Sequence, residues 1–355
     1  MMIRIVDRYL LTQIAGGVLL TMLVLVGIDA FISFINELDE VGRGDYGFSQ
    51  AASYILFTLP RRIYDYAPTA VLIGGLLSLG GMAAQNEVTA LRAAGLSVWG
   101  FVGSILKIGV LFVLIIFLVG ELAAPAGSRH GQQLKSKMLS GKAAVSRQGG
   151  VWIRHKDLFV RSRVILDGQS ILDLDIFRFD GLRLVEAVHA GSAERMDNGW
   201  LLKNLARAKI GENGIVKSHS DSEVWPELVA RNLFEVLSVN PSEMGMTDLY
   251  AYTRYLEDNA LDSGAYKLAF WNRFVVPLSS IVMLLLALPF VFSSQRSGGA
   301  GQRLFIGVLL GIGYFLSSRL LNQLGLVYGL PPFLAAILPP TLFLLLAWFL
   351  LRRVA

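Results

Sequence analysis

Long apolar runs gather near the two ends of the chain and leave a polar stretch of domain size between them. The runs that predict membrane-spanning helices cover residues 10–35, 54–84, 98–122, 268–292, 304–324 and 333–351. A bilayer core needs about 20 mostly apolar helical residues to cross it. We therefore predict three spans before the polar stretch and three after it, which places both termini on the same side of the membrane.

The second run is the least regular, because Pro60 and Pro68 interrupt it and three charged residues lie between them. Proline removes a backbone donor and clashes with the preceding turn of a helix. We expect residues 69–84 to form the clean span, and the part before Pro68 to be a broken or interfacial entry.

The polar stretch reads as β-structure. Leu172, Leu174 and Ile176 alternate with aspartates, the period of two that is typical of a half-buried strand. Asn198-Gly199 is a strong hairpin signal, and Gly211 to Gly214 predicts another turn. Short strands with regular turns suggest a sandwich or a jelly roll. A helix that Thr247 can cap then leads back to the membrane.

These patterns predict an α-helical membrane protein with an inserted all-β domain. The predicted boundaries are 1–126 for the first three spans, with a short loop helix at about 85–95, 127–245 for the β domain, 246–266 for the connecting helix and 267–355 for the last three spans.

Composition excludes several classes of function. Apolar residues make up 54% of the chain and charged residues 17%, which is typical of membrane proteins. The net charge of +5 is spread without a dense basic run, which argues against nucleic-acid binding. The chain contains no cysteine, so it can form neither a disulfide nor a thiolate metal site.

Catalysis finds little support. The four histidines (His130, His155, His189 and His219) show no metal-ligand spacing and are expected to be exposed strand or loop residues. The segment Ser140-Gly-Lys-Ala143 resembles part of a phosphate-binding loop, but Ser136 and Ala143 stand where that motif needs Gly and Ser or Thr. We expect no catalytic residue, metal or cofactor in this chain.

Charge in the short loops predicts the orientation. With the N-terminus inside, the inner segments carry Arg4, Arg8, Arg92, Arg296, Arg303, Arg352 and Arg353 against Asp7 and Glu87. The first outer loop carries Glu37, Asp39, Glu40 and Asp45 against Arg43. Basic residues favour the cytoplasmic side. This asymmetry predicts cytoplasmic termini and a β domain outside the cytoplasm.

The loop between the second and third spans, residues 83–95, favours a helix. Asn86 can cap it, Gly95 stands where it would end, and Glu87 and Arg92 are its only charges. One interpretation is a connecting helix with a solvated acid. The other is a lever that docks in a groove of a soluble partner, with Glu87 against a basic group. The residues alone favour neither.

Several charged or small residues in and near the spans are candidates for binding or packing. Asp29 and Arg319 lie in apolar spans, where charged side chains usually face a cavity or a partner, although both lie close enough to the outer boundary to snorkel. Arg61, Arg62, Arg129 and Lys135 also lie on the predicted outer side, and together they could bind an anionic head group. Gly307 and Gly311 form a small-x-x-x-small face that permits close helix approach.

Four groups of residues together resemble the lipopolysaccharide export permeases of the LptF/LptG family, and the LptG branch more closely. They are Asp7-Arg8-Tyr9, Gln85-Asn-Glu87 with Ala93-Ala-Gly95, Gly120-Glu121 followed by Ala124-Pro125, and Val327-Tyr-Gly-Leu-Pro-Pro332. The resemblance covers essentially the whole chain, and it depends on the order and spacing of the groups.

The resemblance implies a permease subunit of an ABC transporter in the Gram-negative inner membrane. Its implied partners are an LptF-like permease, two LptB-like ATPase subunits that bind ATP and Mg²⁺, and the LptC-like and LptA-like proteins of a periplasmic bridge. The loop helix becomes a coupling helix, which makes Glu87 and Arg92 the expected ATPase contacts. Spans one and five would line the lateral gates, where Asp29, Ser33, Gly307 and Gly311 are expected to act.

One departure from the family concerns the lipid contacts. Well-known relatives carry lysines that face the lipid A phosphates where this chain has Ser33, Asp39 and Glu40. Arg61 falls where relatives have a basic residue, and Lys135 is a second candidate. Arg62, Arg129 and Arg319 are further candidates from charge alone. The sequence leaves open whether a divalent cation bridges Asp39 or Glu40 to a phosphate.

Three other functions compete with this one. The first is a permease for another periplasmic lipid or lipoprotein, which would share the coupling loop but bind a different head group. An anchored interaction module would use the β domain alone, although six spans exceed what anchoring requires. A secondary transporter would need a cluster of ion-coupling carboxylates, and the spans contain none that is convincing.

Overall fold

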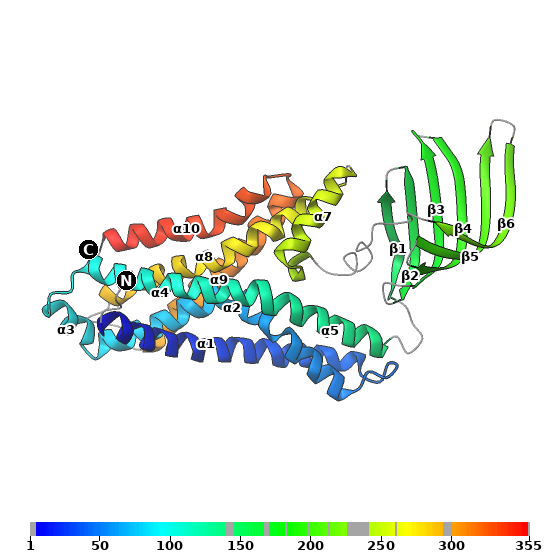
Figure 1. The fold of residues 1–355 in the computed structure, drawn as a ribbon. Coiled ribbons are helices and arrows are strands. Elements are labelled where there is room, and N and C mark those ends of the chain that lie inside the picture. The colour runs from blue at the N-terminus through cyan, green and yellow to red at the C-terminus, as the bar shows by residue number, and fades with distance from the viewer. Residues whose placement is uncertain are drawn as a thin grey trace.

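The computed structural model shows a bundle of long helices with a β-sheet at one end (Figure 1). It describes residues 5–139, 145–155, 157–166, 170–181, 183–196, 199–211, 214–225, 241–259, 261–293 and 300–353. Both ends of the chain lie at the end of the bundle far from the sheet, beside the short helix α3 (Figure 1). We refer to the two ends of the bundle as the sheet end and the α3 end.

The helices follow the predicted order. They are α1 (Ile5–Glu37), α2 (Phe48–Ala84), α3 (Glu87–Ala93), α4 (Val98–Leu118), α5 (Ala124–Leu139), α7 (Met246–Asp258), α8 (Gly264–Ser293), α9 (Ala300–Val327) and α10 (Pro332–Arg352). Three short turns join them: η1 (Leu38–Glu40), the π-helical turn η2 (Val119–Ala123) and η3 (Pro241–Glu243).

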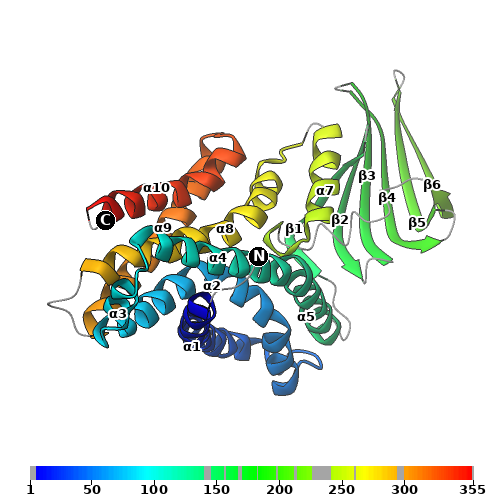
Figure 2. The ribbon, with the colours of Figure 1, turned by 60° about the vertical axis from the view of Figure 1, so that its left-hand side comes forward.

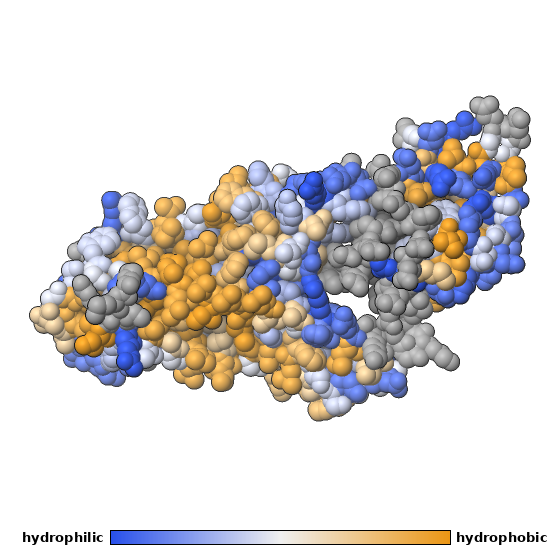
Figure 3. Space-filling view, viewed as in Figure 1, coloured by the Kyte–Doolittle hydropathy of each residue, from blue (hydrophilic) through white to orange (hydrophobic). Residues whose placement is uncertain are grey.

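Among the described residues, six helical segments are long and apolar enough to cross a membrane, which confirms the predicted fold class. They are Ile5–Glu40, Phe48–Ala84, Val98–Lys135, Gly264–Val291, Leu304–Val327 and Pro332–Arg352. Hydrophobic residues cover the middle of the bundle, while polar residues gather at its ends and over the sheet (Figure 3). The inserted sheet therefore lies outside the apolar band.

The second span is a single continuous helix, and the predicted broken entry before Pro68 is wrong. α2 has 37 residues and contains both Pro60 and Pro68. Pro68 is buried, as are Tyr64, Ala67 and the residues that follow in the middle of the helix. α2 packs against α1, α5, α8 and α9, and these neighbours support the helix where proline removes a hydrogen bond.

The third span continues beyond its predicted end. After η2 the chain remains helical as α5 to Leu139, so residues 127–139 are helical rather than part of the β domain predicted to begin at 127. α5 is polar but packs closely on α2. Gly127 permits this approach, since a Cβ there would lie 2.2 Å from the carbonyl oxygen of Phe57. This close helix contact explains the later boundary.

The inserted domain is a six-stranded antiparallel sheet with its strands in sequence order. The strands are β1 (Val145–His155), β2 (Leu158–Leu166), β3 (Ser170–Asp180), β4 (Arg183–Met196), β5 (Gly199–Gly211) and β6 (Gly214–Trp225). The predicted hairpins are confirmed, because Met196 pairs with Gly199 and Gly211 pairs with Gly214. Within the described residues the strands form one curved meander rather than the two sheets of a sandwich (Figure 2).

Two helices form the centre of the bundle. Leu72 and Leu76 of α2 pack in one buried cluster with Met283 and Leu286 of α8. By contrast, α1 and α9 expose many large apolar side chains, as expected for helices that face lipid or another subunit. A further cluster joins Leu174 and other inner residues of the sheet to Leu249 and Leu256 of α7, so α7 shares a core with the sheet.

Candidate functional site

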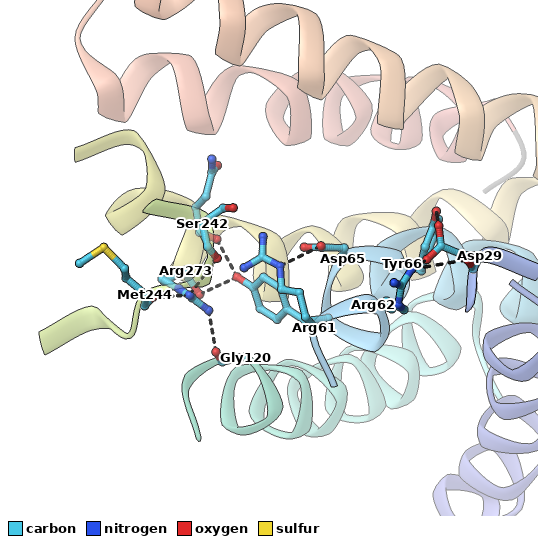
Figure 4. Close-up of polar contacts among 11 residues, drawn as sticks. Asp29, Arg61, Arg62, Asp65, Tyr66, Gly120, Ser242, Met244 and Arg273 are labelled. Carbon is cyan, nitrogen blue, oxygen red and sulfur yellow. Dashed lines mark hydrogen bonds and ion pairs between the residues drawn. The ribbon is translucent and has the colours of Figure 1, made fainter. Parts of the chain in front are cut away.

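Charged side chains gather on the sheet-end half of α2, where Arg62 contacts α1 and the neighbouring Tyr64 contacts α8 (Figure 4). Arg62 forms an ion pair with Asp29 of α1, and its Nη1 also donates to Ser33 Oγ at 2.7 Å. Tyr66 donates to the second carboxylate oxygen of Asp29 at 2.9 Å. Asp29, Ser33 and Arg62 were separate candidates in the sequence, and the structure joins them, with Tyr66, into one seam between α1 and α2.

Arg61, the neighbour of Arg62, points to another side of α2 (Figure 4). Its Nε donates to Asp65 one turn later at 2.9 Å, and its guanidinium lies 5.7 Å from the ring centre of Tyr64. The Asp65 side chain is 44% exposed, whereas that of Arg61 is only 19% exposed, so the pair is reached from the carboxylate side. An external anion could bind Arg61 only by displacing Asp65.

Arg129 and Lys135 of α5 also have acidic partners. Arg129 pairs with Asp248 of α7. Lys135 Nζ lies 2.5 Å from Glu37 Oε1 and 5.1 Å from the ring centre of Tyr54. Arg129 thus joins α5 to α7, and Lys135 joins α5 to α1.

Tyr46 completes the group around Glu37. Its hydroxyl donates to Glu37 Oε1 at 2.8 Å, and the residue is buried. Burial raises the pKa of Tyr46 far above its ordinary value, and the hydrogen bond to Glu37 adds to the shift. The hydroxyl therefore stays protonated and serves as a donor to Glu37.

Arg319 differs from the other candidate cations. It is exposed on α9, and its guanidinium lies 5.9 Å from the ring centre of Phe315. Within the part of the chain that the structure describes, no acidic group forms an ion pair with it. Arg319 is thus the candidate whose charge is most available to a ligand.

The acidic loop after α1 is partly neutralised. Glu40 forms an ion pair with Arg43 at 2.8 Å, and Asp39 is exposed. The loop therefore presents little positive charge at the sheet end.

Arg273 of α8 was not among the residues named from the sequence, yet it donates to three backbone carbonyls at this end. It is 4% exposed. Its Nη1 donates to the carbonyl of Gly120 at 2.6 Å, and its Nη2 donates to Ser242 at 3.1 Å and to Met244 (Figure 4). An arginine inside an apolar run is a signal that the sequence did contain.

The α3 end holds the predicted coupling residues. α3 covers Glu87–Ala93, slightly shorter than the predicted 85–95, and Asn86 stands at its start without the expected side-chain cap. Val88 is 2% exposed and joins the bundle core, whereas Arg92 is exposed. Tyr9 of α1 donates to Glu87 Oε2 at 2.8 Å. This hydrogen bond joins the start of α3 to α1.

The glycine face of α9 packs within this chain. A Cβ at Gly307 would lie 2.9 Å from Leu76, and one at Gly311 would lie 2.8 Å from Thr69. Both contacts are with α2. The two glycines thus permit a close α2–α9 seam.

The sheet brings one histidine next to two aspartates, which spacing along the chain did not predict. His189 pairs with Asp175 in the β3–β4 register, and their side chains lie 2.8 Å apart. The donor atoms of Asp173, Asp175 and His189 lie within 4.8 Å of one another. Arg161 also approaches Asp175, at 4.0 Å, so the cluster is an ion-paired patch on the sheet. The segment Ser140–Ala143, considered above as a phosphate loop, lies outside the described residues, as do Arg4 and Arg296.

Comparison with known proteins identifies similar chains. The model of a family described as lipopolysaccharide export system permease LptF/LptG matches residues 8–353. The lipopolysaccharide export system permease protein LptG of Haemophilus influenzae is 31% identical over 355 residues, which cover 99% of each chain. The protein of the same name from Escherichia coli K12 is 28% identical over 354 residues, which cover 98% of each chain.

Proposed function

Because the chain belongs to the lipopolysaccharide export system permease family LptF/LptG, we propose that it is a membrane subunit of an ATP-driven lipopolysaccharide exporter. It would pair with an LptF-like permease, bind two LptB-like ATPase subunits, and pass the lipid to LptC-like and LptA-like bridge proteins. ATP and Mg²⁺ would be bound by the ATPase. The observation that carries this proposal is the family match over residues 8–353 of a six-span bundle.

The charge at the two ends of the bundle supports an orientation. In the helix ends and short loops, Arg8, Arg92, Arg352 and Arg353 lie at the α3 end against Asp7 and Glu87, and Glu37, Asp39, Glu40 and Asp45 lie at the sheet end against Arg43. Basic residues favour the cytoplasmic side of an inner membrane. We place α3 in the cytoplasm and the sheet in the periplasm.

In this orientation α3 can transmit the closure of the ATPase. Its exposed face, which includes Arg92, is available to a soluble partner, while Val88 anchors it in the bundle core. Glu87 lies between these two faces and contacts Tyr9. We assign Glu87 and Arg92 to ATPase coupling.

The sheet end can receive the lipid. The exposed apolar faces of α1 and α9 suit acyl chains, because they offer the chains surroundings as apolar as the bilayer core that the lipid leaves. Arg319 and Arg61 are placed to bind phosphate, since the first has no acidic partner among the described residues and the second has an accessible one. The other candidate cations, Arg62, Arg129 and Lys135, would need to exchange an ion pair for a phosphate.

The lateral gates are proposed at the outer faces of α1 and α9. Asp29 and Ser33 hold α1 to α2 through Arg62, and Gly307 and Gly311 hold α9 to α2. Both helices thus rest on α2 and present their remaining faces outward. A partner permease would complete each gate from the other side.

Purification of the complex tests the proposal. The chain, tagged and extracted from its native membrane in mild detergent, is expected to co-elute with an ATPase and a second six-span permease. Lipopolysaccharide should change the rate of ATP hydrolysis by this complex. Elution without any ATPase, also under gentler extraction, would contradict the proposal and favour an anchored module.

The head-group assignment predicts that Arg319→Gln weakens lipopolysaccharide binding by about tenfold, because a hydrogen bond to a charged group contributes roughly 1.5–3 kcal/mol. The binding isotherm of fluorescent lipopolysaccharide on the purified complex measures this change. Arg352→Gln is the matched control, since Arg352 lies at the α3 end and stacks on Trp348 at 3.9 Å. Equal affinity in both variants would remove Arg319 from the site.

A further inference from the structure

The chain leaves the membrane helices for the sheet at one place and returns at another, and the two places meet. The exit runs through η2 into α5, and the return runs through η3 into α7. Arg273 of α8 contacts both, because Nη1 donates to Gly120 in η2 while Nη2 donates to Ser242 in η3 and to Met244 beside it. One buried guanidinium therefore joins the exit, the return and the membrane bundle.

Arginine suits this position for geometric reasons. Its guanidinium is planar and presents five N–H donors in a fixed fork, so it can serve carbonyls from two segments at once. Carbonyls at chain turns need such donors when they are buried. At 4% exposure Arg273 is closed to a lipid head group, which separates it from the candidate cations described above.

Tyr64 of α2 supports the same point from the bundle side. Its hydroxyl donates to the carbonyl of Asn272 at 3.0 Å, and its ring lies 5.6 Å from the guanidinium of Arg273. Gly120 makes room for this ring, because a Cβ there would lie 2.3 Å from Tyr64 Cε2. The π-helical turn at Gly120 thus presents its carbonyl to Arg273 without a side chain in the way.

Two further ties join the exit to the return. Glu121 Oε1 accepts from the backbone N–H of Met246 at 2.8 Å, at the first residue of α7. A carboxylate there satisfies a free N–H and is favoured by the helix dipole. Further along, Arg129 of α5 pairs with Asp248 in the first turn of α7.

α7 carries this fixed geometry to the sheet. Leu249, Tyr252 and Leu256 of α7 belong to the same buried cluster as Leu174 and Trp225 of the sheet. In Figure 2 α7 lies between the bundle and the sheet. We propose that Arg273 is a positioning residue that fixes both connections of the sheet to the membrane helices. It thereby sets the orientation in which the sheet receives the lipid, a role that rests on the proposed function.

Distance measurements between spin labels test the positioning role on the purified chain in nanodiscs, without ATP or partners. The chain has no cysteine, so labels at Ser218→Cys on β6 and Tyr328→Cys after α9 are the only ones present. Both positions are exposed. We expect a single narrow distance peak for this pair, and loss of that peak when Arg273→Met is added. A second pair, Tyr328→Cys with Ala94→Cys, should keep its distance and so report an intact bundle.

Lys267→Gln is the matched control, because the ion pair of Lys267 with Glu257 joins α8 to α7 and leaves the exit untouched. Its sheet-to-bundle peak should remain narrow. If Arg273→Met does not fold, Arg273→Lys keeps the buried charge but lacks the fork of donors that reaches two segments at once, and it should broaden the same peak. A narrow peak in Arg273→Met, or in Arg273→Lys where the first variant is lost, overturns the proposal.

The assembled complex then tests the link to transport. Arg273→Met should retain ATP hydrolysis and lose release of lipopolysaccharide to the periplasmic acceptor, whereas Lys267→Gln should retain both. Full release by Arg273→Met overturns the transport clause. If the wild-type complex itself releases no lipopolysaccharide while the label peaks behave as expected, the proposed function fails and the positioning role stands.

Discussion

Replacing Glu87 by alanine is expected to reduce lipopolysaccharide export by about tenfold or more, the range of a typical coupling free energy between two sites. Glu87 begins α3, the short helix that we place against the ATPase, and Val88 beside it anchors that helix in the bundle core. Without the Glu87 carboxylate, α3 would lose a contact with the ATPase, and α3 would transmit the closure of the ATPase less well. Export from membrane vesicles to a purified acceptor measures the effect, with ATP hydrolysis recorded on the same sample.

Tyr9→Phe is the control that separates an external contact from an internal one. The hydroxyl of Tyr9 donates to Glu87 Oε2 at 2.8 Å and also interacts with Gln13 of its own helix, and the variant removes both contacts while Glu87 keeps its carboxylate. The bond between Tyr9 and Glu87 is exposed, so water can replace the lost hydroxyl as a donor to the carboxylate, and export should change little. Equal loss in both variants would show that Glu87 acts through α1 instead of through the ATPase. Full export by Glu87→Ala would end the coupling assignment.

The spans were predictable because membrane crossing demands a length of apolar helix that hydropathy alone reveals. The continuity of α2 was not, because its tolerance of Pro60 and Pro68 depends on helices that pack around it. The helical structure of residues 127–139, at the start of the inserted segment, was not predicted for the same reason. α5 is polar in sequence, and its contact with α2 depends on Gly127 lying against Phe57.

The candidate site was predictable as a list of charges, and its pairing was not. Asp29 and Arg62 lie on different helices, and nothing in their spacing fixes the rotation that brings them together. The sheet register likewise placed His189 beside Asp175. Arg273 carried a readable signal, an arginine in an apolar run, but its partners are backbone carbonyls that any sequence possesses.

The seam between α1 and α2 predicts a large effect from a very small change. A Cβ at Gly74 would lie 2.5 Å from the Cα and the backbone nitrogen of Val18. A side chain could rotate away from such a contact, but a helix backbone must shift as a whole. Gly74→Ala should therefore push α1 outward and weaken the Asp29–Arg62 pair on the same seam. Overpacking of this kind costs about 1–3 kcal/mol.

The thermal midpoint of the purified chain in detergent should fall by about 2 °C or more in Gly74→Ala. Gly16→Ala and Gly81→Ala are matched controls on the same two helices, since a Cβ at either position meets nothing within 4 Å. Alanine is a better helix former than glycine by roughly 0.5–1 kcal/mol, so both controls should keep or raise the midpoint. A midpoint for Gly74→Ala that matches the controls would mean that α1 and α2 are not in backbone contact. In that case the Asp29–Arg62 ion pair could not hold α1, the proposed gate helix, against α2.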